Sequence, residues 1–190
     1  GELYALVSRI CDKSRTMKRI IEDFLDFQAI EDAQLKIKPT PQDLNQVARG
    51  VVESQRDYAA SKQIELDFEL HPSLPLLQAD GERIAQVMDN LVGNAIKYSH
   101  LGGQITVRTL INPDGQQGFE VRDSGPGIPP GEMDKLFAKY SRLSNRPTGG
   151  EKSSGLGLWI CKSLVEMHAG TISARNHPEG GAAFGFWLPG

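Results

Sequence analysis

Residues 89–99, DNLVGNAIKYS, constrain the fold of this sequence more than any other stretch. They continue a helical pattern that opens near Asp80, with apolar residues every three or four positions: Ile84, Val87, Met88, Leu91 and Ala95. Asn90, Asn94 and Lys97 form a second stripe on an adjacent face. Two amides and an ammonium on one helical face suit a ligand that offers a metal ion and anionic oxygens. A solvated polar face is the alternative.

Length and composition are those of a globular domain with no general affinity for polyanions. The 190 residues are 39% hydrophobic and 24% charged, with room for one domain and an appendage. A net charge of −3 provides no attraction to nucleic acid, so any phosphate site has to be local. No apolar run reaches the roughly 18 residues that a membrane span needs. Two cysteines that lie far apart in the sequence predict a reducing, cytoplasmic setting. Whether a longer parent protein carries a membrane anchor is left open.

The N-terminal segment carries a long helical pattern of its own. Apolar residues recur at alternating four- and three-residue steps from Leu3 to Phe24, which is typical of one strand of a coiled coil or helical bundle. Pro39 and Pro41 break this pattern. We therefore expect residues 1–38 to be a helix with a linker that packs on a partner helix. Packing on its own domain is the alternative.

Residues 39–190 alternate between helical and strand patterns and are expected to form one domain. Asp43 and Asp80 are the predicted N-caps of two helices, and a third helix opens at residues 155–157 and stops at Gly170. A short helical piece is predicted at 133–140. Alternating apolar residues predict strands at 64–70, 105–111, 119–122, 171–174 and 182–188. The predicted fold is an α/β two-layer sandwich, a mixed β-sheet with helices packed on one face, preceded by the long N-terminal helix.

Glycine-containing segments follow the central helix. Asp123 ends a strand before Gly125 and Gly127, where the backbone can turn sharply and approach a flat ligand, although an ordinary turn has the same sequence. Its carboxylate can accept a hydrogen bond from an exocyclic amine such as that of adenine. Residues 141–154 are polar and lack periodicity, which predicts a mobile, functional loop. Glycines at 155 and 157 would leave free N–H groups at a helix start, which favour phosphate.

Other motifs for phosphate, metal or nucleophile chemistry are incomplete in this sequence. The residues G-E-K-S at 150–153 lack the glycine that directly precedes the lysine of a P-loop. Neither glycine pair completes G-x-G-x-x-G, because Pro130 and Ile160 occupy the third position. Cysteines and histidines show no metal-ligand spacing, and no nucleophile–base motif is present.

Taken in order, these segments resemble the ATP-binding catalytic domain of sensor histidine kinases, which shares the Bergerat ATP fold with gyrase, Hsp90 and MutL. The resemblance covers nearly the whole chain. The matching segments are residues 89–99 (N box), 123–127 (G1 box), 137–142 (F box), 154–158 (G2 box) and 180–186 (a final glycine box). Residues 20–44 resemble the second dimerisation helix and its link to the catalytic domain. Five boxes in this order are more specific than any one of them.

The resemblance implies ATP and Mg²⁺ as ligands and a role for four residues of the central helix. Asn94 would give its amide oxygen to Mg²⁺, a cation that keeps waters and phosphate oxygens and so needs few protein ligands. Asn90 and Lys97 would be the catalytic residues that position the phosphates, and Tyr98 would flank the nucleotide. Phosphoryl transfer asks mainly for positioning and charge neutralisation, which these groups supply.

The resemblance also implies roles for the glycine boxes. Asp123 would read the adenine amino group, with Gly125, Gly127 and Ile128 around the base. The residues implied to close over or bind the phosphates, together with the 141–154 lid, are Tyr140, Arg142, Ser154, Gly155, Leu156, Gly157 and Leu158. Ala183 stands where the family often has a hydroxyl residue before the phenylalanine, so a hydroxyl contact to adenine is not expected. Tyr140 stands where phenylalanine is common.

Partners follow from the same resemblance. In the family the phospho-acceptor histidine lies on a first dimerisation helix, upstream of where this sequence begins. The γ-phosphate would therefore pass to a histidine outside the chain, in the dimerisation and phospho-acceptor domain of the same kinase, and from there to the receiver domain of a response regulator. The four histidines of the chain lack the surrounding H-box pattern. A homodimer through the N-terminal helix is expected in the full-length protein, and no nucleic acid partner.

Two other functions remain as alternatives. A water-activating ATPase of the same fold places a glutamate where this chain has Asn90, whose amide cannot act as a general base near neutral pH. A catalytically silent pseudokinase could act as a scaffold through the helix at residues 3–30. The intact Asn94, Asp123 and helix-start glycines argue against that second alternative.

Overall fold

The computed structural model describes the chain except residues 1, 142–143, 145–146 and 149–153. Its elements in chain order are α1 (Glu2–Glu31), β1 (Thr40–Gln42), α2 (Leu44–Ser61), β2 (Glu65–Glu69), β3 (Leu77–Ala79), α3 (Gly81–Tyr98), β4 (Gln104–Ile111), β5 (Gln117–Arg122), the 3-10 turn η1 (Met133–Lys135), α4 (Gly157–Met167), β6 (Thr171–Asn176) and β7 (Ala182–Leu188). This order confirms the alternation of helical and strand patterns read from the sequence.

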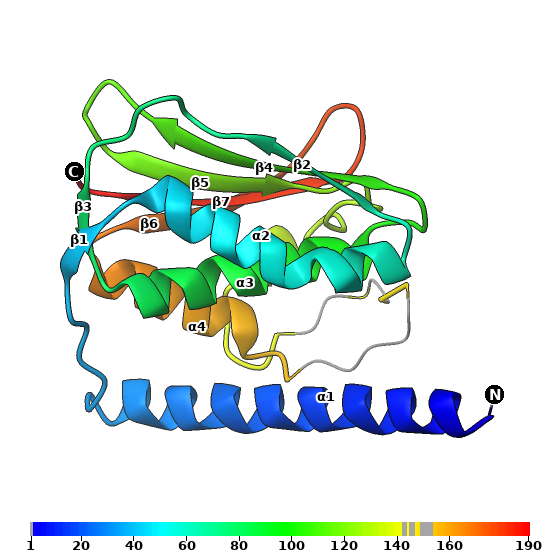
Figure 1. Cartoon of the computed structure of the whole chain (residues 1–190). Coiled ribbons are helices and arrows are strands. Elements are labelled where there is room, and N and C mark those ends of the chain that lie inside the picture. Colours follow the sequence, from blue (N-terminus) through cyan, green and yellow to red (C-terminus); the bar gives the residue numbers. More distant parts are fainter. Residues whose placement is uncertain (1, 142–143, 145–146, 149–153) are drawn as a thin grey trace.

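A mixed five-stranded sheet forms one layer of the molecule. Its strand order is β2-β4-β5-β7-β6, in which β2 and β4 pair in parallel and the other neighbours are antiparallel. Helices α2, α3 and α4 cover one face of the sheet, and α1 runs beneath these helices (Figure 1). The predicted α/β two-layer sandwich is confirmed, with α1 added on the helical side.

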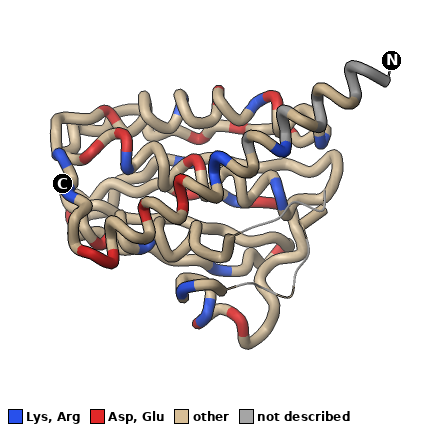
Figure 2. The backbone as a smooth tube through the Cα atoms, turned by 90° about the horizontal axis from the view of Figure 1, so that it is seen from below, with Lys and Arg blue, Asp and Glu red and all other residues tan. Residues whose placement is uncertain are grey.

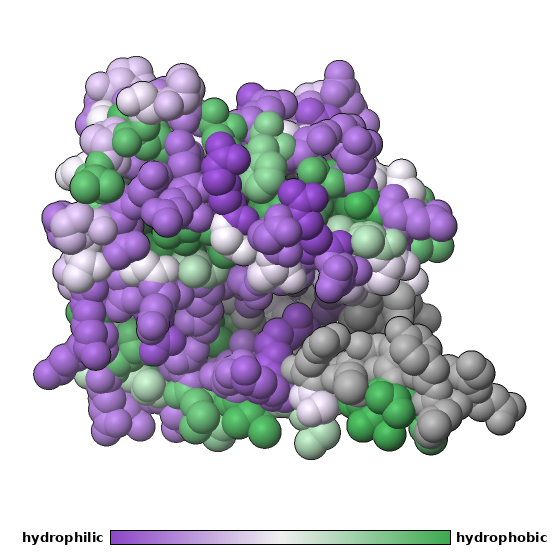
Figure 3. Space-filling view, in the orientation of Figure 1, coloured by the Kyte–Doolittle hydropathy of each residue, from purple (hydrophilic) through white to green (hydrophobic). Residues whose placement is uncertain are grey.

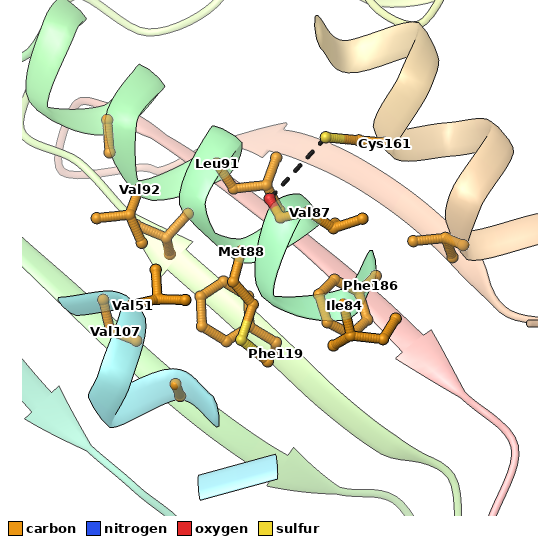
Figure 4. Close-up of a cluster of buried hydrophobic side chains, with 14 of the residues drawn as sticks. Val51, Ile84, Val87, Met88, Leu91, Val92, Val107, Phe119, Cys161 and Phe186 are labelled. Atoms are coloured by element: carbon orange, nitrogen blue, oxygen red, sulfur yellow. Dashed lines mark hydrogen bonds between the residues drawn. The ribbon is translucent and has the colours of Figure 1, made fainter. Parts of the chain in front are cut away.

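The apolar stripe of α3 forms the centre of the core. All five residues of the stripe are buried. Figure 4 shows Val87, Met88 and Leu91 among the side chains that fill the space between α3 and the sheet, where Phe119 and Phe186 stack with ring centroids 5.5 Å apart. Burial of each large apolar side chain stabilises the fold by roughly 1.5–3 kcal/mol. The packing fixes the rotation of α3, and therefore the direction of its polar face.

Two capping aspartates begin the helices that the sequence predicted. Asp43 accepts hydrogen bonds from the backbone N–H groups of Asn45 and Gln46 at the start of α2. Asp80 accepts one from the N–H of Arg83 at the start of α3, at 3.2 Å. Each carboxylate satisfies donors that the first helical turn leaves unpaired. Both predicted caps are confirmed.

Three local predictions need correction. The break near residue 40 contains strand β1, which pairs with β3 in a small antiparallel sheet that the sequence did not reveal. The helical piece predicted at 133–140 is reduced to the three residues of η1. Ala169, not Gly170, takes the left-handed conformation after α4, with φ 56°. Gly170 is required for a different reason, because a Cβ there would collide with the backbone oxygen of Trp187.

Helix α1 leaves much of its apolar surface exposed. Apolar patches follow the edge of the molecule along α1 (Figure 3). The exposed large hydrophobic residues of this helix are Leu6, Val7, Ile10, Met17, Ile20, Ile21, Phe24 and Leu25. Lys and Arg residues are interspersed with Asp and Glu over the helical side (Figure 2). In the described part of the chain, no helix combines the length and apolarity needed to cross a membrane.

Candidate functional site

Two amide side chains form a pair on the polar face of α3. Asn94 donates from Nδ2 to Oδ1 of Asn90 at 3.0 Å, and both side chains are half-buried. This bond orients the Asn94 amide and leaves its Oδ1 without a hydrogen-bond partner among the described residues. The structure therefore places a neutral amide oxygen one helical turn from a second amide.

The start of α4 packs directly against this amide pair. A Cβ at Gly157 would lie 2.6 Å from Nδ2 of Asn90, so a side chain at this position would displace the Asn90 amide. The first hydrogen bond of α4 runs from the N–H of Ile160 to the oxygen of Leu156. The N–H groups of residues 157–159 accordingly have no partner within the helix, and they lie at its positive dipole end. The N-box and G2-box segments thus meet at the Asn90–Gly157 contact.

The C-terminal end of α3 is buried. Lys97 is only 3% exposed, and its Nζ lies 5.3 Å from the ring centroid of Tyr98. The buried Lys62 donates from Nζ to the backbone oxygens of Ile96 and Lys97, which neutralises the negative end of the helix dipole. Thr148 also donates its backbone N–H to the oxygen of Lys97, at 3.1 Å. These bonds fix the helix end that precedes the candidate site residue Tyr98.

Asp123 occupies a buried position at the end of β5. Its Oδ1 accepts hydrogen bonds from the backbone N–H groups of Gly125, at 2.8 Å, and Ala182, at 3.2 Å. Among the described residues Oδ2 has no hydrogen-bond partner. Burial raises the pKa of Asp123, and the two N–H donors oppose that rise. The turn also touches α3, since a Cβ at Gly125 would lie 2.7 Å from the backbone oxygen of Tyr98.

Ile128 forms a small apolar cluster beside this turn. It is 4% exposed and packs with the buried Leu136 and Ala182. Leu158 of α4 lies against the same cluster and against the main core. The G1-box turn and the G2-box helix are therefore joined through apolar contacts as well as through α3.

The sequence did not reveal the role of Asn176 at the end of β6. Its side chain pairs with both backbone polar atoms of Ile128: Nδ2 donates to the oxygen at 2.9 Å, and Oδ1 accepts from the N–H at 2.7 Å. A polar residue at a strand end is unremarkable in a sequence, so no local signal distinguishes Asn176 from other surface asparagines.

Helix α1 contacts the chain on both sides of the predicted lid. Ser154 donates to Oδ2 of Asp23 at 2.7 Å, and Phe27 lies with its ring centroid 5.8 Å from Tyr140. Tyr140 has φ 57°, and a Cβ at Gly155 would approach the Tyr140 backbone within 3.1 Å. The two ends of the lid therefore touch one another. Arg142 and most of the 141–154 loop lie outside the described residues.

Of the remaining predicted site residues, Leu156 has its side chain in the core, whereas Gly127 is notable for its backbone conformation. Leu156 is 4% exposed and belongs to the main core, so only its backbone faces away from the interior. Ser154 accepts the N–H of Leu156 on Oγ while it donates to Asp23. Gly127 has φ 76°, a conformation that favours glycine.

Known proteins are similar in sequence to much of this chain. The family model "histidine kinase-, DNA gyrase B-, and HSP90-like ATPase" matches residues 79–190, more than half of the chain. The adaptive-response sensory kinase SasA of Crocosphaera subtropica is 33% identical over 184 residues, which cover 97% of this chain and 48% of that protein. The sensor histidine kinase RcsC of Salmonella typhimurium is 33% identical over 186 residues, 97% of this chain and 19% of that protein.

Solved structures show the same likeness in three dimensions. Full-length ShkA in complex with AMPPNP superposes with a TM-score of 0.81 at 26% identity, covering 100% of this chain and 39% of that one. The histidine kinase ThkA in complex with the response regulator protein TrrA superposes with a TM-score of 0.71 at 25% identity, covering 95% of this chain and 49% of that one. The chain spans about half or less of the length of these curated relatives. It belongs to the family of histidine kinase-, DNA gyrase B- and HSP90-like ATPases and is homologous to the catalytic domains of sensor histidine kinases.

Proposed function

We propose that this chain is the catalytic part of a two-component sensor histidine kinase that works in the cytoplasm. It binds Mg·ATP and transfers the γ-phosphoryl group to a histidine outside these 190 residues, for relay to the receiver domain of a response regulator. Homology to SasA, RcsC and ShkA supports this function, and the ThkA–TrrA complex is a precedent for the partner.

The observation that carries the proposal is the amide pair of Asn90 and Asn94 against the start of α4. The Oδ1 of Asn94, which has no hydrogen-bond partner in the described part of the chain, suits Mg²⁺, a hard cation that keeps several waters and also binds phosphate oxygens. Mg²⁺, when bound, neutralises charge on the phosphate oxygens. The N–H groups of Gly157 and its neighbours attract those oxygens, because a helix N-terminus favours anions.

The residues of the chain divide the work of phosphoryl transfer. Asn90 and Lys97 hold phosphate oxygens and align them, while Tyr98 flanks the nucleotide. Tyr140, which precedes the 141–154 lid, and Ser154, its last residue, set where the lid closes. This chain forms no covalent bond in the proposed reaction. Alignment of the phosphates and neutralisation of their charge therefore account for most of the rate enhancement.

Recognition of the base is assigned to Asp123. Its Oδ1 accepts hydrogen bonds from two backbone N–H groups, which leaves Oδ2 as the oxygen proposed to meet the base. Oδ2 then accepts a hydrogen bond from the adenine amino group, while Gly125 and Gly127 let the backbone approach the ring. Ile128 closes the apolar side of this pocket.

Helix α1 is proposed to be the second dimerisation helix, with residues 1–38 as one unit and 39–190 as the catalytic domain. Its exposed apolar side chains, which include Val7, Ile10 and Met17, fit a partner helix or a second copy in the full-length protein. An ATPase function is disfavoured because Asn90 cannot activate water.

The test combines binding and transfer. Calorimetry should detect Mg·ATP binding by the 190-residue chain. After addition of the parent's dimerisation region, radiolabelled ATP should yield an acid-labile, base-stable phosphohistidine on that region. Release of inorganic phosphate without transfer would instead indicate an ATPase, and failure to bind ATP would indicate a scaffold.

A further inference from the structure

We propose that Asn176 is a positioning residue for the adenine end of the site, outside every motif assigned above. The inference rests on the proposed ATP-binding function. Asn176 bonds both polar backbone atoms of Ile128 through one side-chain amide, at 2.7 and 2.9 Å. These two bonds are of the kind that a neighbouring strand would make to the backbone of Ile128, which lies outside the sheet.

The G1-box turn continues the chain beyond the last residue of β5 and is held by hydrogen bonds at two places. Its two ends are Asp123 and Ile128. Asp123 is held by Ala182, since the Asp123 N–H donates to the Ala182 oxygen at 2.9 Å and the Ala182 N–H donates to Oδ1 of Asp123. Asn176 holds Ile128 at the other end. Both supports come from the hairpin that joins β6 to β7.

These two supports are paired with one another in the sheet. Asn176 and Ala182 are opposite residues at the last position of the β6–β7 ladder. One cross-strand pair therefore sets the separation between Asp123, which reads the base, and Ile128, which lines it. A rigid spacer of this kind fixes the geometry of the adenine pocket before nucleotide binds.

Close packing leaves the turn little freedom to adjust around Asn176. A Cβ at Gly127 would lie 2.9 Å from Oδ1 of Asn176, so the backbone of Gly127 is in close contact with the Asn176 side-chain amide. Gly181 of the same hairpin lies so near Asp123 that a Cβ there would collide with the Asp123 backbone oxygen. Loss of the amide frees the Ile128 end of the turn while the Asp123 end stays anchored.

The test compares ATP with ITP, which lacks the exocyclic amine that Asp123 would read. In the wild-type chain ATP should bind more tightly than ITP. Asn176→Ala should weaken ATP binding about five- to tenfold, as expected for one to two lost hydrogen bonds. ITP binding should fall less, so that the ATP/ITP affinity ratio decreases. Calorimetry measures both affinities.

A matched control separates positioning from stability. Asn112 also makes side-chain hydrogen bonds within a turn, to Gln116 and to the N–H of Asp114, at the opposite end of β5. Asn112→Ala should lower the melting temperature by a similar amount and leave the ATP/ITP ratio unchanged. Asn176→Asp keeps the acceptor for the Ile128 N–H and loses the donor, so it should retain the fold and lower the ratio partly.

The outcomes distinguish this inference from the function on which it rests. If the wild type binds ATP and ITP equally, the adenine-reading site itself is wrong. If the wild type discriminates and both Asn176 variants discriminate as well as it does, Asn176 has only a structural role and the inference is overturned.

Discussion

The two ends of the candidate site are built in different ways. At the adenine end, Asp123 and Ile128 are fixed by the sheet, through backbone and side-chain bonds from the β6–β7 hairpin. The phosphate end lies where the start of α4 meets the middle of α3, at the contact of Asn90 with Gly157. Among the described residues, the contacts from α1 to candidate site residues are at this second end, to Ser154 and Tyr140. The groups proposed to recognise the base are therefore held from within residues 39–190, while those proposed to bind phosphate lie beside groups that also contact α1.

The α1 contacts at the phosphate end share one helical face. Asp23, Phe27 and Glu31 follow one another at intervals of four residues, which places them side by side. They contact the polar or aromatic groups that flank the lid: Ser154, Tyr140, Trp159 and Lys139. We therefore expect a shift of α1 to affect the residues that flank the predicted lid more than Asp123 and Ile128.

The largest expected effect is at the phosphate end. Asn94→Ala removes the proposed Mg²⁺ ligand and should weaken Mg·ATP binding by about 100-fold or more. The melting temperature should change little, because the side chain is half-buried and lies outside the core. Binding of adenosine, which needs no metal, serves as the control for the adenine end. An unchanged Mg·ATP affinity by calorimetry would rule out this ligand.

At the adenine end, Asp123→Asn replaces an anionic acceptor with an amide. ATP affinity should fall by about 10- to 100-fold, because a hydrogen bond to a charged group is lost. ITP affinity should fall less than that of ATP. Equal losses for the two nucleotides would contradict the base-reading role. The dependence on Mg²⁺ should remain, which would show that the two ends are separable.

A third variant tests the dependence of the phosphate end on α1. Phe27 is 8% exposed and lies 5.2 Å from the Trp159 ring centroid. Phe27→Ala should destabilise the docked helix by about 2–4 kcal/mol. Protease cleavage of α1 should accelerate and ATP affinity should change, while adenosine affinity stays constant.

The matched control is Phe24→Ala on the same helix. Phe24 is 53% exposed, so its removal should affect neither cleavage nor nucleotide binding. If Phe27→Ala alters adenosine and ATP binding equally, the proposed independence of the adenine end is wrong.

The smallest expected effect is a pH dependence of the α1 contact. Burial raises the pKa of Asp23, although hydrogen bonding from Ser154 opposes this. The folded state therefore binds the Asp23 proton more tightly than the unfolded state does. This contribution to stability is present at low pH and is lost as the pH rises through the raised pKa.

Asp23→Asn should remove the loss of stability that Asp23 causes at higher pH, while its side chain still accepts the Ser154 hydrogen bond. Thermal unfolding from about pH 4 to pH 7 should show the variant gaining stability relative to the wild type as the pH rises. Asp32→Asn, in the turn after α1, is the control and should follow the wild type. A constant difference between Asp23→Asn and the wild type would contradict this sign.

Much of the fold could be predicted because its signals are local. The apolar stripe of α3, the alternation within β4 and the caps at Asp43 and Asp80 each depend on residues close in sequence. The family resemblance added the order of the boxes. Strands β1 and β3 were missed because three-residue strands carry too few residues for a periodic signal.

The candidate site was predicted residue by residue but not as an arrangement. The sequence indicated Asn90, Asn94 and Asp123, since their types and spacing suit a nucleotide. It could not reveal Asn176, whose partner Ile128 is 48 residues away. Nor did it reveal the bond between Asp23 and Ser154, which joins residues 131 positions apart. Such pairs are created only when the chain folds.

The sequence by itself determined the helices, the strands and the chemistry available on α3, because these follow from short-range periodicity and residue type. The tertiary structure decided that the amide pair meets Gly157, that one hairpin holds both ends of the G1-box turn, and that α1 lies on the lid ends. The physical reason is that hydrogen bonds and close packing act over a few ångströms in space, whatever the separation along the chain.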